Sequence, residues 1–390
     1  MDMASAWDNL FQISALPDIA ETGGAHNQRA TDFQRYWSIA EMVALELSGS
    51  ADYLFLFEAF QDVAILDAEL NPSRLRIYQI KKKDRNEWTW AELTRLPIPG
   101  TSKRGKLASL SPYELISSSA IGKLYAAVRA CTQFDAEGTF LSNAGCDIPL
   151  SSGDSAATTV SSKLSALDAP LASQLASALV GFHQEPSPTV SLDRLGVAKT
   201  EISVSDPHRH VLGIVSQFIG ARSPDHASQS KPFLDALVAQ VGVLGGRTEK
   251  CTTPTELRTR HGYSRAQFLR ALQWLEATPD LRQIWNDWLN RLASEGTPPQ
   301  HITRIRLAHS RALQARLAAA ESPEALELET ECDAWLARNA CGASLRDFIS
   351  AAVSQVGRQS GLDHFEIVAT ILWKAVQSCA DQTSENSYEA

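Results

Sequence analysis

Residues 29–82 constrain the fold most, because a helical pattern there is followed by three strand patterns in quick succession. Apolar side chains recur at helical spacing in RATDFQRYWSIAEMVALEL (29–47), which predicts an amphipathic helix. Apolar and aromatic residues then predict strands at 53–58, 61–67 and 74–82, with a turn at Asn71-Pro72-Ser73 before the last strand. Helix and strand patterns mixed in this way indicate an α/β or α+β domain.

The rest of the chain changes character at about residue 220. Helical patterns are predicted at 113–134 and 156–181, and strands at 139–150 and 199–205. Beyond residue 210 the strand signals stop, while helical periodicity continues to the polar C-terminal tail. We therefore predict a lead-in with little periodic pattern at 1–25, an α/β domain at 26–220, and an all-α domain at 221–390 that serves assembly or partner binding.

The composition excludes several classes of protein. A net charge of −9 argues against a protein that coats nucleic acid by bulk charge. No apolar run approaches the roughly 20 residues that a membrane-spanning helix needs, and the first residues hold acids where a signal peptide would carry Lys or Arg. The cysteines are scattered without a C-x-x-C pair, which favours reduced thiols over disulfides or a zinc site. We expect a cytoplasmic protein.

One group of polar residues stands at the strands predicted in the first half. Glu58 and Asp62 lie at the junction of the first two predicted strands. Gln79 and Lys81 are two residues apart on the third strand, so their side chains project from the same face. If the second and third strands pair as a hairpin, Asp62 lies near Gln79 and Lys81. Carboxylate and amide oxygens are ligands for Mg²⁺ or Mn²⁺, and an ammonium offsets charge on a phosphate in its transition state. The group therefore suits phosphodiester hydrolysis.

Several segments resemble the PD-(D/E)xK nuclease superfamily. The resemblance rests on the helix with Phe33-Gln34, FEAFQDVAI (57–65) and YQIKKK (78–83), with Gln79 at the acid position of the second half-motif. More closely, residues 22–220 resemble the double-stranded-DNA endonuclease domain of bacterial anti-phage effectors, to which LSNAGCDIPL (141–150) and KTEISVSD (199–206) are also similar.

This resemblance implies a restriction-endonuclease-like mixed sheet flanked by helices, and metal-dependent cleavage of duplex DNA during phage infection. It implies Asp62, Gln79 and Lys81 as catalytic residues, and Glu58, Asp62 and Gln79 as metal ligands. Some relatives end in a domain that binds cyclic oligonucleotides, which the helical half does not resemble. Others are encoded with a hexameric HerA-type ATPase, and a helical oligomerisation domain suits that arrangement. The alternatives are a DNA-binding or adaptor protein that keeps the nuclease scaffold without catalysis, and an RNase on the same fold.

A basic segment surrounds the predicted site. Residues 74–106 hold ten Lys or Arg against three acids, a local charge of 10 − 3 = +7. One interpretation is a surface that follows DNA phosphates, and the other is a solvated basic face with Trp88 and Trp90 in the core. The residues that we predict to contact DNA are Lys82, Lys83, Arg85, Lys103, Arg104 and Lys106.

A second segment, 253–275, has the spacing of a helix-turn-helix, with Thr255 and Ser264 as helix caps around a turn at His261-Gly262. DNA reading by its arginines is one interpretation, and an ordinary pair of helices in a bundle is the other. The chain lacks both G-x-x-x-x-G-K-[ST] and G-x-G-x-x-G, so bound ATP or NAD is not indicated.

Overall fold

The computed structural model describes residues 3–16, 19, 28–100, 110–185, 189–244, 251–277, 282–318, 320–339, 344–356 and 361–385. The chain divides into two units. Unit 1 comprises Met1–Ile214 and Gln240–Phe268, and unit 2 comprises Val215–Ala239 and Leu269–Ala390. Each unit is described by itself.

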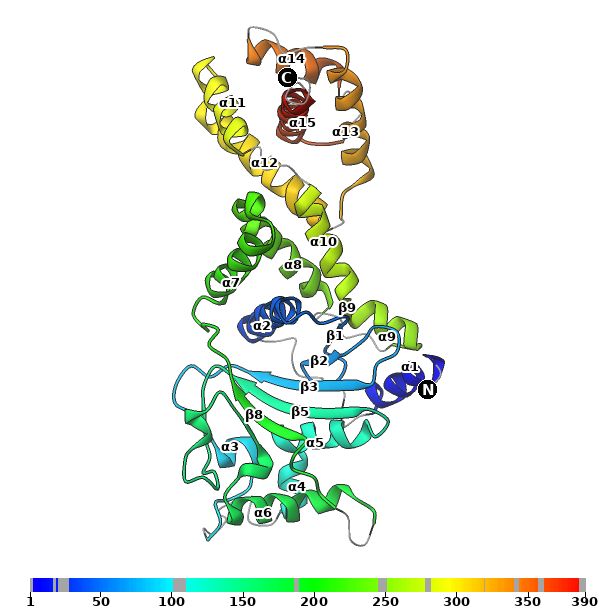
Figure 1. Ribbon diagram of the computed structural model, residues 1–390, viewed down its shortest axis with the longest axis vertical. Coiled ribbons are helices and arrows are strands. Elements are labelled where there is room, and N and C mark those ends of the chain that lie inside the picture. Colours follow the sequence, from blue (N-terminus) through cyan, green and yellow to red (C-terminus); the bar gives the residue numbers. More distant parts are fainter. Residues whose placement is uncertain are drawn as a thin grey trace. The chain divides into compact units, whose positions relative to one another are not determined.

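A mixed sheet forms the centre of unit 1 (Figure 1). The described residues give it seven strands in the order β7-β8-β5-β3-β2-β1-β9. The strands are β1 (Leu54–Phe57), β2 (Val63–Leu66), β3 (Arg74–Lys81), β5 (Asp135–Ser142), β7 (Ser161–Lys163), β8 (Leu195–Lys199) and β9 (Gly262–Ser264). β3, β5 and β8 are parallel, and the other pairs are antiparallel. A separate parallel pair joins β4 (Trp88–Thr89) to β6 (Cys146–Asp147).

The strand registers bring three carboxyl ends to one edge of the sheet. Lys81, the last residue of β3, lies beside Ser142 of β5, which lies beside Lys199 of β8. The hairpin of β2 and β3 pairs Val63 with Tyr78, so the residue that precedes β2 faces the end of β3. The predicted hairpin is therefore confirmed, and polar residues after β1 and along β3 meet at this edge.

Helices cover both faces of this sheet (Figure 1). α2 (Gln28–Leu47) lies on one face, where Trp37 packs on Tyr78 with ring centroids 4.7 Å apart. α5 (Ala120–Ala130) lies on the other, and its Leu124 joins Leu75 and Ile77 in the main core. The shorter helices are α3 (Trp90–Thr94), α4 (Pro112–Ser117), α6 (Ala169–Leu179) and α9 (Pro254–His261). The predicted α/β fold, a mixed sheet flanked by helices, is confirmed.

The structure corrects several predicted elements before residue 210. The segment 3–14 is a helix, α1 (Met3–Ser14), whose Leu10 and Ile13 are buried at helical spacing, so a lead-in without periodic pattern is wrong there. The predicted helix at 113–134 is two helices, because Ser119 caps the second by accepting from the Gly122 amide. The strand predicted at 199–205 is β8 instead, which ends at Lys199, since Leu195 and Val197 are the side chains buried there. Residues 156–181 begin with β7 and short 3₁₀ turns and are α-helical only in α6.

A further correction concerns residues 253–275, where the turn of the expected helix pair is a strand. β9 lies between α9 and α10 (Arg265–Ala277) and pairs with β1 at the edge of the sheet. Strands therefore do not stop at residue 210. Thr253 caps α9, not Thr255, and Tyr263 of β9 is buried. The residue spacing did not predict β9, because a three-residue strand is too short to show an alternating pattern of apolar and polar residues.

Unit 2 is helical in its described residues, as predicted. Its helices include α11 (Arg282–Ser294), α12 (Pro299–Leu317), α13 (Pro323–Leu336), α14 (Leu345–Gln355) and α15 (His364–Glu385), while α7 (Pro207–Arg222) and α8 (Ser230–Leu244) lie partly in it. His309 lies between Trp285 and Trp373, with ring centroids 4.4 Å and 4.5 Å away, and burial lowers the pKa of its imidazole to about 4. Among the helices that the structure describes, none is long and apolar enough to span a membrane.

Candidate active site

The active-site loop, residues 58–62, connects β1 to β2 and delivers Asp62 to the edge of the sheet. The Glu58 amide donates a hydrogen bond to the Asp62 carbonyl at 3.0 Å, one step beyond the last β1–β2 pair, Phe57 with Val63. Glu58 and Gln61 have φ values of 52° and 63°, in the left-handed region that non-glycine residues rarely adopt. Such conformations cost on the order of 1–3 kcal/mol each and persist where neighbouring contacts hold them. Gln61 is held by its amide, which donates to the Ile19 carbonyl at 3.1 Å.

Asp62 is held by two donors from β3. Its side chain is fully buried, at 0% exposure, and lies 3.2 Å from the Lys81 ammonium through Oδ1. Its Oδ2 accepts from the Ile80 amide at 2.6 Å. The structure therefore brings together Asp62 and Lys81, as the predicted hairpin requires. Lys81 keeps 34% of its side chain exposed, so the ammonium reaches solvent beside a buried carboxylate.

Gln79 completes the described polar group on β3. Gln79 and Lys81 are two residues apart on the strand, so their side chains project from the same face of the sheet. Gln79 lies one register step beyond the Val63–Tyr78 pair, which places it opposite Asp62. The residue is 3% exposed, and its Oε1 is buried without a hydrogen-bond partner in the described structure. A buried carbonyl oxygen in this state is costly in a protein interior, and such atoms often mark a site for an ion or water.

Gln34 was not among the predicted site residues, although it lies in the helix that carries the resemblance. Its side-chain amide donates to the Ile80 carbonyl at 3.3 Å, and Ser38 Oγ donates to the Gln34 carbonyl at 2.9 Å. Gln34 is buried on α2, and its hydrogen bond orients the backbone between Gln79 and Lys81. A glutamine among the apolar positions of an amphipathic helix is the signal that could have identified it.

The oxygens at this edge fit a hard divalent cation. The Asp62 carboxylate and the Gln79 Oε1 atom are the ligand types that Mg²⁺ and Mn²⁺ accept, and the unpartnered Gln79 oxygen is the observation that favours one. In the part of the chain that the structure describes, no three His, Cys, Asp or Glu residues cluster as a metal site, so the donor set depends on the amide. Glu58 stands at the start of the active-site loop with its side chain partly exposed.

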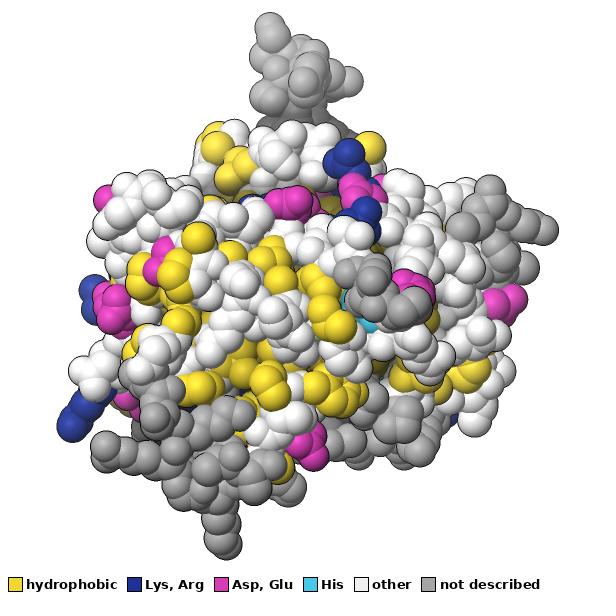
Figure 2. All heavy atoms as spheres, turned by 90° about the horizontal axis from the view of Figure 1, so that it is seen from below, with side chains coloured by type: hydrophobic (Ala, Val, Ile, Leu, Met, Phe, Trp, Pro, Cys, Tyr) yellow, Lys and Arg dark blue, Asp and Glu magenta, His cyan; other side chains and the backbone are white. Residues whose placement is uncertain are grey.

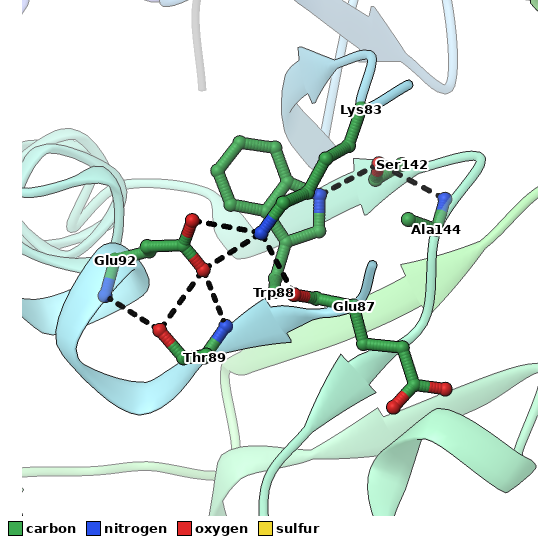
Figure 3. A network of polar contacts seen from close by, with 7 residues as sticks. All are labelled: Lys83, Glu87, Trp88, Thr89, Glu92, Ser142 and Ala144. Atoms are coloured by element: carbon green, nitrogen blue, oxygen red, sulfur yellow. Dashed lines mark hydrogen bonds and ion pairs between the residues drawn. The ribbon is translucent and has the colours of Figure 1, made fainter. Parts of the chain in front are cut away.

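Lys83, two residues after Lys81, has several local partners (Figure 3). Lys83 donates to both carboxylate oxygens of Glu92 at 2.7 Å and to the Glu87 carbonyl at 2.7 Å, and its ammonium lies 4.6 Å from the centroid of the Trp88 ring. The hydrogen bond from Lys83 lowers the pKa of the Glu92 carboxyl below its ordinary value. A DNA phosphate would therefore compete with Glu92 for this ammonium.

The other residues predicted to contact DNA differ in their surroundings. Lys82 pairs with the exposed Asp84 at 3.2 Å, and Arg85 is exposed. The predicted contacts at Lys103, Arg104 and Lys106 lie outside the described residues. Trp90 is buried and the partly buried Trp88 packs edge-on against Phe140, so both tryptophans belong to the core, as one of the two interpretations held.

Comparisons with known proteins give one match. No curated protein and no solved structure matches the chain. The model of the family described as "Cap4, dsDNA endonuclease domain" matches residues 22–242, more than half of the chain. That range includes α2, the active-site loop and β3, and with them Gln34, Asp62, Gln79 and Lys81. The chain therefore belongs to the family of the Cap4 double-stranded-DNA endonuclease domain.

Proposed function

We propose that this chain is a metal-dependent endonuclease that cleaves duplex DNA and acts as an effector in anti-phage defence. Asp62, Gln79 and Lys81 form its catalytic group, and Glu58, Asp62 and Gln79 are the proposed ligands of Mg²⁺ or Mn²⁺. The observation that carries the proposal is the meeting, at one sheet edge, of a buried carboxylate, the ammonium 3.2 Å from it, and an unpartnered buried amide oxygen. Membership of the endonuclease family supports DNA as the substrate.

Each residue has a separate task in this mechanism. A bound divalent cation would polarise the scissile phosphate and lower the pKa of a water molecule. The Ile80 amide holds the Asp62 carboxylate in one orientation, and Gln34 holds the Ile80 carbonyl, so neither must reorganise during the reaction. Lys81 is partly exposed and can meet a phosphate oxygen while it stays beside Asp62. Its positive charge offsets the charge that develops on the phosphate and holds the attacking water.

DNA would approach this edge along the basic segment that follows β3. Phosphates attract lysine and arginine, and the proposed contacts are Lys82, Lys83, Arg85, Lys103, Arg104 and Lys106. On the face seen in Figure 2, hydrophobic side chains gather near the centre, and few Lys or Arg side chains are visible among the described residues. The proposed DNA surface is the carboxyl edge of β3 together with the basic segment that follows it.

The proposed nuclease activity also requires regulation. A nuclease that cleaves duplex DNA must be held inactive in its own cell, so we propose gating by oligomerisation or by a HerA-type hexameric ATPase. Support comes from unit 2, which is helical in its described residues.

Plasmid cleavage tests the catalytic proposal. Purified protein, with and without a HerA-type ATPase, is incubated with supercoiled plasmid in Mg²⁺ or in EDTA. We expect cleavage only with Mg²⁺, and its loss in Lys81→Ala and Asp62→Asn. Lys163→Ala is the matched control, because Lys163 also pairs with a carboxylate of the same sheet, Glu137, at 2.8 Å. A parallel RNA substrate separates DNase from RNase activity.

Cleavage that persists in EDTA or in Lys81→Ala would refute the proposed chemistry. A parent protein that binds DNA but does not cleave it, with its partner present, would favour the adaptor alternative.

A further inference from the structure

A buried histidine contacts the residue that directly precedes the active-site loop. His261 is the last residue of α9, and its Nδ1 lies 2.7 Å from the carbonyl oxygen of Phe57. Phe57 ends β1 and directly precedes the active-site loop. Both residues are buried. Because a carbonyl only accepts, Nδ1 carries the hydrogen in this contact.

The position of His261 follows from the ladder of β1 and β9. The antiparallel register pairs Leu54 with Ser264 and ends at Leu56 with Gly262, so Phe57 falls opposite His261. The backbone of His261 is helical and does not continue the ladder. Its ring nitrogen therefore supplies the hydrogen bond that a further strand residue would have donated to the Phe57 carbonyl.

Neighbouring contacts fix His261 in this place. A Cβ on Gly262 would lie 2.2 Å from the Arg258 carbonyl oxygen, so the chain passes from α9 into β9 through a space that only glycine fits. On the far side of β9, the Arg265 amide donates to the Tyr53 carbonyl at 3.0 Å, and the Arg265 guanidinium binds Glu46 at 2.8 Å. The histidine is thus part of a rigid support for the end of β1.

The active-site loop needs such a support, because two of its residues hold left-handed conformations. Gln61 is tied to the Ile19 carbonyl at one end of the loop, and Phe57 is tied to His261 at the other. We propose that His261 is a positioning residue, which holds the active-site loop so that Asp62 keeps its place beside Lys81. This inference rests on the proposed nuclease function, and His261 lies beyond residues 22–242 that the family model matches.

Two substitutions separate the hydrogen bond from simple packing. His261→Asn keeps a side-chain N–H at about the position of Nδ1, whereas His261→Leu removes it and leaves a buried carbonyl unpaired. Tyr263→Phe is the matched control, because it removes a hydrogen bond of β9 to Gln240, 2.8 Å long, that does not touch the loop. Circular dichroism first establishes that each full-length variant is folded.

Two readouts are then compared between variants. The first is hydrogen exchange of the peptide that covers residues 57–63, without metal or DNA. The second is the Mg²⁺ concentration for half-maximal plasmid cleavage. In His261→Leu we expect exchange of this peptide to rise at least about fivefold and the Mg²⁺ requirement to rise by a similar factor, since an unpaired buried carbonyl weakens the local structure by that order. His261→Asn and Tyr263→Phe should stay near the parent in both.

The outcomes distinguish this inference from the proposed function. If the loop peptide of a folded His261→Leu exchanges like that of the parent, His261 does not position the loop and the inference is wrong. It is also wrong if the loop exchanges faster but the Mg²⁺ requirement is unchanged. A parent protein without cleavage overturns the nuclease proposal itself, while the exchange measurement still decides whether His261 holds the loop.

Discussion

Removing the side-chain oxygen of Gln79 should stabilise the protein while it lowers the cleavage activity. Gln79→Met keeps the length of the side chain and deletes a carbonyl oxygen that is buried without a hydrogen-bond partner. Leaving such a group unpaired costs about 1–3 kcal/mol, so the metal-free free energy of unfolding should rise by up to that amount. Each 1 kcal/mol corresponds to about 2–4 °C in Tm for a unit of this size. Most substitutions of buried polar residues act in the opposite direction.

The converse substitution should make stability depend on metal. Gln79→Glu places a second carboxylate opposite Asp62, with Lys81 as the cation already paired there. Burying an additional charge costs several kcal/mol, which a divalent cation offsets when it binds. We therefore expect Gln79→Glu to unfold more easily than the parent in EDTA and to recover in Mg²⁺ or Mn²⁺.

The assay is urea unfolding of both variants and the parent, in EDTA and in Mg²⁺, followed by plasmid cleavage. Gln79→Met removes a proposed metal ligand, so this variant should cleave plasmid at least about tenfold more slowly than the parent. Mutating a residue that only hydrogen-bonds to a metal ligand already has effects of this size. If Gln79→Met is less stable than the parent in EDTA, its oxygen has a partner in the folded protein, and the reasoning about a preformed metal site is refuted. The same holds if Mg²⁺ does not restore the stability of Gln79→Glu.

Three further predictions concern the surroundings of the site. Glu58→Gly should raise the Tm slightly, because glycine adopts the φ of 52° without strain, while cleavage falls if Glu58 is a metal ligand; equal cleavage would remove Glu58 from the ligand set. Lys83→Met should lower the Tm at pH 7, with a deficit that shrinks as the pH falls below 4.5, because the Glu92 carboxyl, whose pKa Lys83 lowers, becomes protonated; thermal scans at several pH values check this, and a constant deficit contradicts it. Burial raises the pKa of the Cys131 and Cys146 thiols to about 12, so iodoacetamide at pH 8 should label them far more slowly than a thiol in the unfolded chain, as mass spectrometry can measure.

The proximity of Asp62 to Lys81 could be predicted from the sequence because the signals for it are local. Asp62, Gln79 and Lys81 lie on a hairpin with a visible turn, and alternation along β3 decides which side chains share a face. Gln34 was harder to predict, because its role depends on how α2 crosses the sheet, and a helical pattern does not encode that crossing. The left-handed conformations of Glu58 and Gln61 could not be predicted either, since neither residue type favours a positive φ.

β9 shows most clearly why local patterns were insufficient for the fold. Every residue of β1, LFLF (54–57), is buried, so this strand needs a neighbour on both sides and cover on both faces. The chain supplies β2 within ten residues, but the second neighbour comes from residues 262–264, after the helices α7 and α8. An unpaired, apolar β1 would be an exposed edge that promotes aggregation. The buried sequence of β1 therefore demanded a partner strand, but only the long-range register identifies it, and the same register places His261 against the active-site loop.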